Sequence, residues 1–353
     1  MRKGKPIICG LALLLLLSLL PLGGCERKPQ TYSETSFAWF DTVTTLTGYG
    51  TDGECFAQVW QIVEEELDSF HKLYDIYHAY EGIANLYTVN ERIDGAHREV
   101  LVDARIMDLL AFGVEMYEKT DGRVNVAMGS VLSLWHTYRS EGIENPEQAT
   151  LPPMAELEEA SRHTDIHAMI LNEEKNSVYL SDPQMLLDVG AVAKGYAAEM
   201  VAKRLEAEGI VGYVLNLGGN VRTLGGHTDD TPFSIGVENP KKESEEPYIS
   251  IVDLYGESLV TSGSYQRYYT VEGKNYHHII DPNTLMPAVG YRLVSIMCPS
   301  SAQADVLSTA LFMLPLEEGE RLLAEEFSDA DALWVLEDGT VHTTDGWKRA
   351  ESK

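Results

Sequence analysis

Cysteine is scarce in this sequence, which has four among its 353 residues. Small secreted domains held together by disulfides carry a much higher density of cysteine, so a framework of that kind is excluded. The spacing of cysteine and histidine also gives no zinc-binding pattern. The fold must therefore rest on a hydrophobic core, and a hydrophobic content of 44% is enough for one large or two ordinary domains.

Basic residues are scarce as well. The chain has 27 lysines and arginines against 55 aspartates and glutamates, which gives a formal net charge of −28. Such an acidic surface repels nucleic-acid phosphates, and no Lys/Arg-rich cluster with interleaved aromatic residues reverses this. We therefore predict that the protein has no nucleic-acid partner.

The N-terminus has the pattern of a targeting segment. Three basic residues within the first five precede an apolar run over 7–20, which is short for a membrane span. Leu22-Gly23-Gly24-Cys25 follows, and this motif resembles a bacterial lipobox, in which the cysteine is acylated and becomes the mature N-terminus. We predict a signal peptide over 1–24 and a polar, lipid-anchored tether over 25–36.

This interpretation predicts a location for the protein. Acyl chains on one cysteine hold a protein firmly to a bilayer, so we expect a lipid-anchored protein at the cell membrane that faces outside the cytoplasm. An ordinary secretory signal with a chance cysteine, or a retained signal anchor, are the alternatives. With Cys9 removed and Cys25 lipidated, Cys55 and Cys298 are left, and the sequence does not decide whether they pair.

The order of the predicted elements indicates an α+β fold. β-branched residues over 42–49 predict a first strand, and apolar residues at three-and-four spacing predict a long helix over 53–80. Strands and helices do not alternate regularly, as they would in a doubly wound sheet. Further helices are predicted over 103–119, 128–138, 154–163, 190–208, 302–314 and 316–325, and further strands over 168–171, 177–180, 185–189, 213–217, 233–238, 248–254, 258–261, 265–271, 276–280 and 291–298.

The stretch Tyr276–Pro287 combines reactive side chains with a sharp structural stop. A strand-like run ends in His277-His278-Ile279-Ile280, and Asp281-Pro282 then begins a turn, because proline cannot donate to a sheet ladder and presets φ. The strand end can present an imidazole and a carboxylate to a ligand. The alternative is a buried histidine beside a turn.

A second stretch, Asp188–Tyr196, predicts an anion-binding helix N-terminus. A short strand ends near Asp188, and the small residues from Gly190 onward open a helix with Lys194 in its first turn. Helix N-termini attract anions such as phosphate. Asp188 could also simply cap the helix. The paired glycines of Asn216–Asn220 likewise suit a backbone close to a ligand, although alone they indicate only a turn. No Gly-x-Gly-x-x-Gly dinucleotide fingerprint follows a strand.

A third stretch places two oxygen ligands on one face of a helix. Asp305 and Thr309 are one turn apart in the predicted helix, which begins with a capping box from Ser300 to Gln303. Two hard oxygens and a backbone carbonyl, together with waters and substrate phosphates, are how proteins typically hold Mg²⁺. The alternative is a solvated helical face.

Together with Thr261-Ser262-Gly263, these stretches resemble the ApbE family, the FAD:protein FMN transferases, over about 37–343. The resemblance implies one ApbE-like domain over 37–345, with an α+β fold of mixed sheets and surrounding helices that is related to the T-fold. It also implies an enzyme that uses Mg²⁺ to transfer FMN from FAD to a threonine or serine hydroxyl of a target protein, with release of AMP. Expected partners are FMN-accepting redox proteins, such as Rnf- or Nqr-type subunits or extracellular flavoproteins. A Mg²⁺-dependent FAD pyrophosphatase and a non-catalytic FAD-binding lipoprotein are the alternatives.

The resemblance also implies roles for particular residues. The metal would be held by Asp305, Thr309 and the backbone carbonyl of Ala191. His278 would act as a general base for the attacking hydroxyl or contact the flavin closely, and its ordinary pKa suits proton transfer near neutrality. Where relatives often have an arginine and a glycine after Asp-Pro, this chain has Asn283 and Leu285. The residues implied to contact FAD are Phe40, Tyr74, Arg123, Val124, Asn125, Asp188, Lys194 and Ile279.

Overall fold

The structure is a computed structural model that describes residues 30–91, 99–241 and 243–352. The predicted signal peptide over 1–24 and the predicted lipidation site, Cys25, lie outside these residues. Within them, no helix is long and apolar enough to cross a membrane. Cys55 and Cys298 are both free thiols, the first exposed and the second buried, so they do not form the disulfide that the sequence left open.

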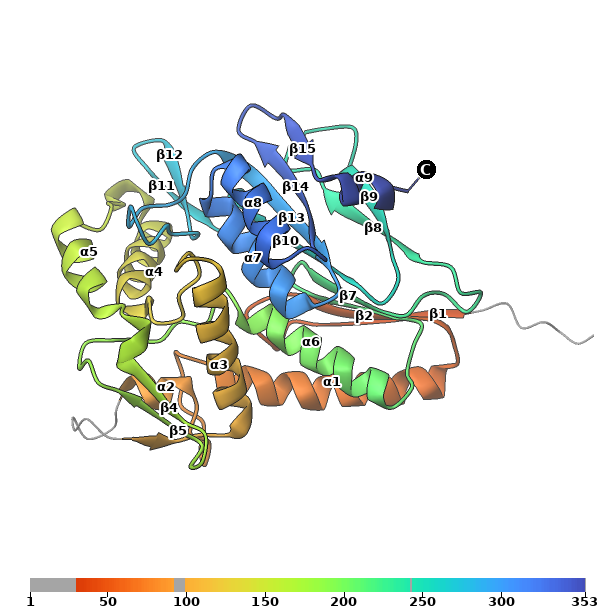
Figure 1. Ribbon diagram of the computed structural model, residues 1–353, viewed down its shortest axis with the longest axis horizontal. Helices are drawn as coiled ribbons and strands as arrows, with labels where there is room; N and C mark the ends of the chain where they lie inside the picture. The colour runs from red at the N-terminus through yellow and green to blue at the C-terminus, as the bar shows by residue number, and fades with distance from the viewer. Residues whose placement is uncertain (1–29, 92–98, 242, 353) are drawn as a thin grey trace, which may run out of the picture.

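A large antiparallel sheet organises the described part of the chain, where eight strands pair side by side (Figure 1). In sheet order they are β1 (Gln30–Ser36), β2 (Thr44–Thr51), β6 (Tyr213–Leu217), β7 (Asn220–Leu224), β10 (Ser258–Gly263), β13 (Tyr291–Cys298), β14 (Asp331–Leu336) and β15 (Val341–Thr343).

Three helices cover one face of this sheet: α1 (Gly53–Tyr74), α6 (Ala193–Ala207) and α7 (Ser301–Met313). α7 packs on β10 and β13, α6 packs on α7 and β7, and α1 packs on α6 and β2 (Figure 1). Most of α7 is buried, including the polar residues Asp305 and Ser308. α8 (Leu316–Glu326) follows α7 directly.

The opposite face is covered by a smaller unit near the C-terminus. The hairpin of β8 (Phe233–Glu238) and β9 (Tyr248–Leu254) packs with α9 (Asp345–Ala350) around the fully buried Trp347. Figure 1 shows this unit at one end of the molecule, away from the helices described next.

A second group of elements lies at the other end of the molecule (Figure 1). The hairpin of β11 (Tyr268–Val271) and β12 (Lys274–His277) packs on α4 (Gly129–Glu144), and the Trp135 indole on α4 donates a hydrogen bond to the Leu285 carbonyl. The group also contains α2 (Leu86–Glu91), β3 (Val100–Leu101), α3 (Ala104–Lys119), α5 (Met154–Ala160), β4 (Met169–Asn172) and β5 (Ser177–Leu180), with 3-10 turns over Pro146–Gln148, Ser161–His163 and Ile166–Ala168.

The α+β prediction is confirmed, but several boundaries differ. The helix predicted over 53–80 ends at Tyr74, because Asp75 has an extended backbone and its carboxylate accepts hydrogen bonds from the next turn. The segment 185–189 is not a strand, and the helix predicted from Gly190 begins at Ala193. The strand β7 was not predicted.

The tether predicted over 25–36 is wrong from Gln30 onward. Residues Gln30–Ser36 form β1, which pairs with β2 along its whole length. Most of the strand is exposed, with only Tyr32 and Ser36 half-buried, so it lacks the alternating apolar pattern that identifies a half-buried strand. Its Thr and Ser residues instead form cross-strand hydroxyl pairs, such as Ser33 with Thr47. The folded domain therefore begins at least seven residues before the predicted boundary at 37.

Candidate functional site

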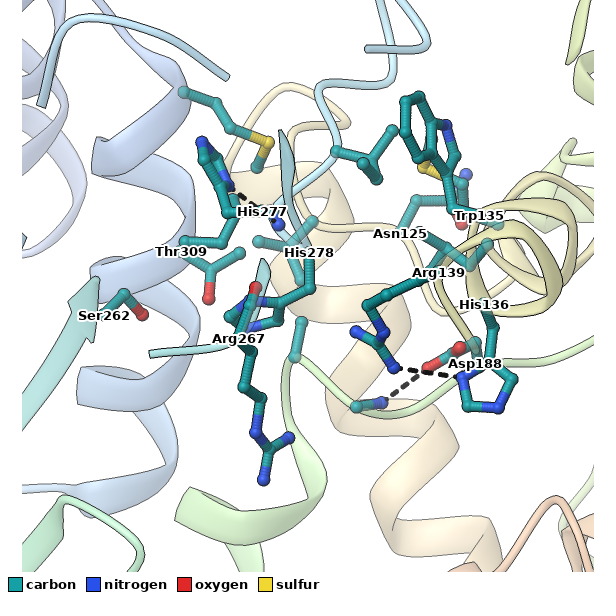
Figure 2. A pocket seen from close by; sticks show the side chains of 18 of the residues that line it. Asn125, Trp135, His136, Arg139, Asp188, Ser262, Arg267, His277, His278 and Thr309 are labelled. Carbon is teal, nitrogen blue, oxygen red and sulfur yellow. Dashed lines mark hydrogen bonds between the residues drawn. The ribbon is translucent and has the colours of Figure 1, made fainter. Parts of the chain in front are cut away.

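Two neighbouring cavities open between the sheet-covering helices and the α4 group. The first cavity, of about 230 Å³, lies against α7 and is lined by Asp305, Thr309, His278 and Ile279, among others. The second cavity, of about 650 Å³, lies beside the end of α1 and is lined by Phe40, His71, Tyr80 and their neighbours. The cavities share one wall, called here the shared wall, which consists of Tyr77, His136, Arg139, Asp188, Gly190, Lys194 and Arg267. Figure 2 labels His136, Arg139, Asp188 and Arg267 of this wall.

At the α7 side of the first cavity, a buried carboxylate meets a lysine. Asp305 is 3% exposed, its Oδ1 lies 3.3 Å from the Lys194 Nζ, and its Oδ2 accepts a hydrogen bond of 2.8 Å from the Gly195 N–H. The Thr309 hydroxyl, one turn further along α7, also lines the cavity. Asp305 is therefore not on a solvated helical face. It joins the first turn of α6 to α7.

Gly195 makes this approach of the two helices possible. A Cβ atom added at Gly195 would lie 2.4 Å from the Ser301 carbonyl oxygen and 2.4 Å from the Asp305 Cβ. Real Cβ atoms do not approach backbone this closely. The small residues of the 188–196 stretch therefore include one that packs helix against helix rather than against a ligand.

Asp188 caps a turn and not the helix itself. Its Oδ1 accepts a hydrogen bond of 2.8 Å from the Gly190 N–H, and its own N–H donates to the Val126 carbonyl. Burial raises the pKa of the Asp188 carboxyl. The shared wall thus holds an acidic group whose ionised form is disfavoured.

The segment 123–125 borders the first cavity from the opposite side. The Asn125 side chain donates to the Thr164 carbonyl and accepts from the Ala127 N–H, so its amide is already used by the fold. Val124 is 2% exposed, and the Arg123 guanidinium lies 3.6 Å from the Asp281 carboxylate. The segment can therefore contact a ligand mainly through its apolar surface and its backbone groups.

The two adjacent histidines have different surroundings. The His277 Nε2 donates to the Ala288 carbonyl and its Nδ1 accepts from the Ile279 N–H, so both ring nitrogens support the turn. Burial lowers the pKa of His277. The alternative of a buried histidine beside a turn therefore applies to this residue.

His278 presents its ring to the first cavity (Figure 2). Its Nδ1 lies 3.2 Å from the Arg267 carbonyl, which must accept a hydrogen bond, so Nδ1 carries the proton and Nε2 is an acceptor. The pKa of His278 is lowered to about 3, mainly because the surrounding protein displaces water from the ring and to a smaller extent because of the positive charge of Arg267. This direction differs from the ordinary pKa expected from the sequence, and it favours the neutral ring.

Two tyrosines near the end of α1 have different positions. Tyr74 touches the second cavity but is 3% exposed, and its hydroxyl donates to the Arg105 carbonyl. Tyr77 is 51% exposed and lines both cavities. Asp75, which is buried, accepts hydrogen bonds from the Tyr77 N–H and the Tyr80 hydroxyl and so holds this loop.

The structure brings the site residues predicted from the sequence to these two cavities, apart from Cys25, which lies outside the described residues. The sequence analysis missed Tyr77, His136, Arg139 and Arg267. Tyr77 could have been noticed if the helix had been ended at Asp75, whose acidic side chain commonly stops a helix by binding backbone N–H groups. The others carry no local signal.

Among the described residues, no group of three or more His, Cys, Asp or Glu side chains is arranged to hold a metal ion. The oxygens that could bind one are the Asp305 carboxylate, the Thr309 hydroxyl and the Ala191 carbonyl, all of which belong to residues that line the first cavity. A set of hard oxygens with few carboxylates suits Mg²⁺, which usually keeps several waters and binds substrate phosphates.

Comparisons with known proteins agree with this geometry. The model of the ApbE family matches residues 40–334 of the chain. The chain belongs to the ApbE family. The predicted resemblance and fold are thereby confirmed.

Among the relatives of this ApbE family member, the FAD:protein FMN transferase of Treponema pallidum is 33% identical over 261 residues, which is 70% of each chain. The FAD:protein FMN transferase of Escherichia coli K12 is 26% identical and covers 88% of this chain and 89% of its own. The crystal structure of the ApbE protein from Thermotoga maritima has a TM-score of 0.78 at 25% identity, covering 92% of this chain and 100% of that one.

Proposed function

We propose that this protein is an FAD:protein FMN transferase, which moves FMN from FAD to a threonine or serine hydroxyl of a target protein and releases AMP. The observation that carries the proposal is the pair of cavities joined at the shared wall, with Lys194 and Asp305 beside the junction. FAD consists of two bulky ends linked by a diphosphate. Each cavity would receive one end, and the diphosphate would lie at the cationic junction.

Mg²⁺ fits the α7 side of this junction. Asp305, Thr309 and the Ala191 carbonyl would hold the ion, which when bound supplies charge neutralisation to the diphosphate. Since Lys194 already neutralises Asp305, the lysine would turn from the carboxylate toward the phosphates when the metal binds. Phosphoryl transfer needs charge neutralisation and in-line positioning more than a protein nucleophile, and these residues are suited to both.

The proposed role of His278 rests on the hydrogen bond that its Nδ1 makes to the Arg267 carbonyl. The neutral ring offers Nε2 as a hydrogen-bond acceptor to a hydroxyl entering the first cavity. The low basicity favours orienting the attacking hydroxyl over removing its proton before attack. Transfer through a loose transition state requires little deprotonation of the nucleophile at the start.

We further propose that the protein is anchored to the cell membrane by lipid on Cys25 and faces outside the cytoplasm. The supporting observation is the lipobox-like sequence that ends at Cys25. Membrane redox proteins that accept FMN, such as Rnf- or Nqr-type subunits, and extracellular flavoproteins would be accessible targets there.

Mass spectrometry tests the activity. The full-length protein in detergent is incubated with FAD, Mg²⁺ and a separate FMN-accepting domain, and both the acceptor mass and the released nucleotide are measured. Transfer predicts an acceptor heavier by one FMN residue, with no gain when the acceptor threonine is replaced. AMP and free FMN with an unmodified acceptor would indicate a pyrophosphatase. Intact FAD would leave only a binding protein.

A further inference from the structure

Arg139 is a cation of the shared wall that forms no ion pair with any described residue. It lies on α4, is partly buried, and lines both cavities. Its Nη2 lies 3.1 Å from the His136 Nδ1, and it forms no ion pair with any described residue, although the charge of Asp188 acts on it. A guanidinium has five N–H donors, so the contact with His136 leaves donors of Arg139 available to a ligand in the cavities that it lines.

Arg267 is a second such cation on the same wall. It follows β10 and also lines both cavities. Its Nη2 lies 3.4 Å from the Asp41 carbonyl, and its own carbonyl accepts from His278, but in the described part of the chain it has no ion-pair partner. Figure 2 shows the side chains of Arg139 and Arg267 in the space between α4 and α7.

Arginines that support the fold of this protein are paired. The buried Arg222 lies 3.4 Å from Glu199 and 3.1 Å from Glu206, and Arg105 forms an ion pair of 2.8 Å with Asp103. Arg139, which is partly buried, and Arg267, which is exposed, differ from both, because they line the cavities and form no ion pair with any described residue. A ligand therefore accounts for them better than a structural role does.

The local electrostatics favour an anionic ligand. Burial lowers the pKa of Arg139, and the positive charge of Arg267 lowers it further. Asp188 is the acidic group that faces Arg139, and burial disfavours its ionised form. With Lys194, the junction thus gathers three cations in a chain whose net charge is −28. Bringing an anion between them would relieve the repulsion between the two guanidiniums.

We propose that Arg139 and Arg267 bind the diphosphate of FAD at the junction of the two cavities, on the side away from Asp305. This inference rests on the proposed function. Arginine suits the position because its planar fork can hold two phosphate oxygens at once. The diphosphate would then be held between a metal-binding side, with Asp305 and Thr309, and an arginine side.

The test compares ligands with and without phosphate. Full-length wild type, Arg139→Gln and Arg267→Gln are titrated with FAD and with riboflavin, in EDTA and in Mg²⁺, by quenching of flavin fluorescence. Arg162→Gln is the matched control, because Arg162 is exposed and pairs with Glu159 outside both cavities. We expect each of the two variants to bind FAD at least about tenfold more weakly, because each loses one charge-assisted hydrogen bond to the diphosphate. Riboflavin binding by these variants, and FAD binding by the control, should not change.

Two outcomes would overturn the proposal. FAD affinity equal to that of the wild type in both variants would exclude phosphate contacts. An equal loss for FAD and riboflavin would show a structural role. If Arg139→Gln does not fold, as judged by circular dichroism, the exposed Arg267 carries the test alone. A wild type that binds FAD but leaves the acceptor unmodified would refute the proposed transferase without touching the arginine assignment.

Discussion

The Lys194 Nζ lies 3.3 Å from Oδ1 of the buried Asp305, so the first turn of α6 is joined to α7 by an ion pair at the edge of the first cavity. Breaking one partner of a buried pair costs more than the pair contributes, since it leaves an uncompensated charge. Substitutions at Asp305 therefore test both the metal assignment and the helix contact, and a substitution that keeps the shape of the side chain is needed to separate them.

Asp305→Asn should abolish most Mg²⁺-dependent turnover while retaining the fold. The amide keeps the size of the carboxylate and can still accept from the Gly195 N–H, but it is a poor ligand for Mg²⁺. We expect a loss of about 100-fold or more, because even outer-shell changes at metal sites cost about 10–100-fold. The measurement is AMP release against Mg²⁺ concentration. Asp345→Asn, at an exposed pair with Lys348, serves as the control, and normal Mg²⁺ dependence in Asp305→Asn would refute the metal assignment.

Gly195→Ala should destabilise the protein and impair activity together. The added methyl would lie 2.4 Å from the Ser301 carbonyl oxygen, so α6 and α7 must move apart, and overpacking of this kind costs about 1–3 kcal/mol. Urea unfolding measures the loss. In Gly53→Ala the nearest atom to the added methyl is 3.4 Å away, an ordinary contact, so this control should stay close to the wild type. Equal stability of both variants would contradict the packing described for the helix pair.

Tyr77→Ala and Tyr74→Phe should have opposite effects. Tyr77 is 51% exposed and faces both cavities, so its removal should weaken FAD binding and leave the free energy of unfolding nearly unchanged. Tyr74→Phe removes the buried hydrogen bond to the Arg105 carbonyl, which should cost about 0.5–1.5 kcal/mol of stability with little change in FAD affinity. Fluorescence titration and urea unfolding of both variants provide the comparison. A larger affinity loss in Tyr74→Phe would assign the flavin contact to that residue instead.

The low pKa of His278 predicts how stability depends on pH. Its pKa falls from the ordinary value of 6.5 to about 3 in the folded protein, so between these values the unfolded state binds more protons. Stability therefore falls as the pH decreases through this window and does not depend on this group above it. The charges of Arg267, Arg139 and His277 disfavour the charged form of His278, whereas the hydrogen bond to the Arg267 carbonyl favours it.

His278→Gln removes this titration. Urea unfolding at pH 7, 6, 5 and 4 should show a smaller loss of stability toward low pH in the variant than in the wild type. His342→Gln is a suitable control, since His342 is partly exposed and pairs with Glu320 on the surface. Parallel pH profiles for the wild type and His278→Gln would mean that the ring keeps its ordinary pKa and can serve as a general base after all.

Several strands could be predicted from the sequence with their exact bounds, among them Tyr213–Leu217, Phe233–Glu238 and Tyr291–Cys298. The first alternates as a strand with one buried face does, and the last is a nearly continuous buried run of strand-forming residues. β1 carries polar residues on both faces and is defined only by its partner β2, about which a local pattern says nothing.

The residues of the candidate site likewise divide into those that the sequence could identify and those that only the structure identifies. Asp188, Lys194, Asp305 and His278 stand in motifs that a family resemblance can identify, and the described structure places them around one cavity. Arg139 could not be found in this way, because an arginine near a helix end is ordinary in a sequence. Its significance depends on which carboxylates are absent around it, and that is a property of the packed chain alone.

The early start of β1 would limit how far the domain can stand from a lipid anchor at Cys25. If Cys25 carries the lipid, five peptide steps separate it from Gln30, the first residue of the strand, and a fully extended chain spans about 17 Å over that length. The catalytic domain would then remain next to the bilayer surface instead of sampling a wide volume. Its acceptors would have to present their hydroxyl close to the membrane, which would select substrates by their height above the lipid as well as by their sequence.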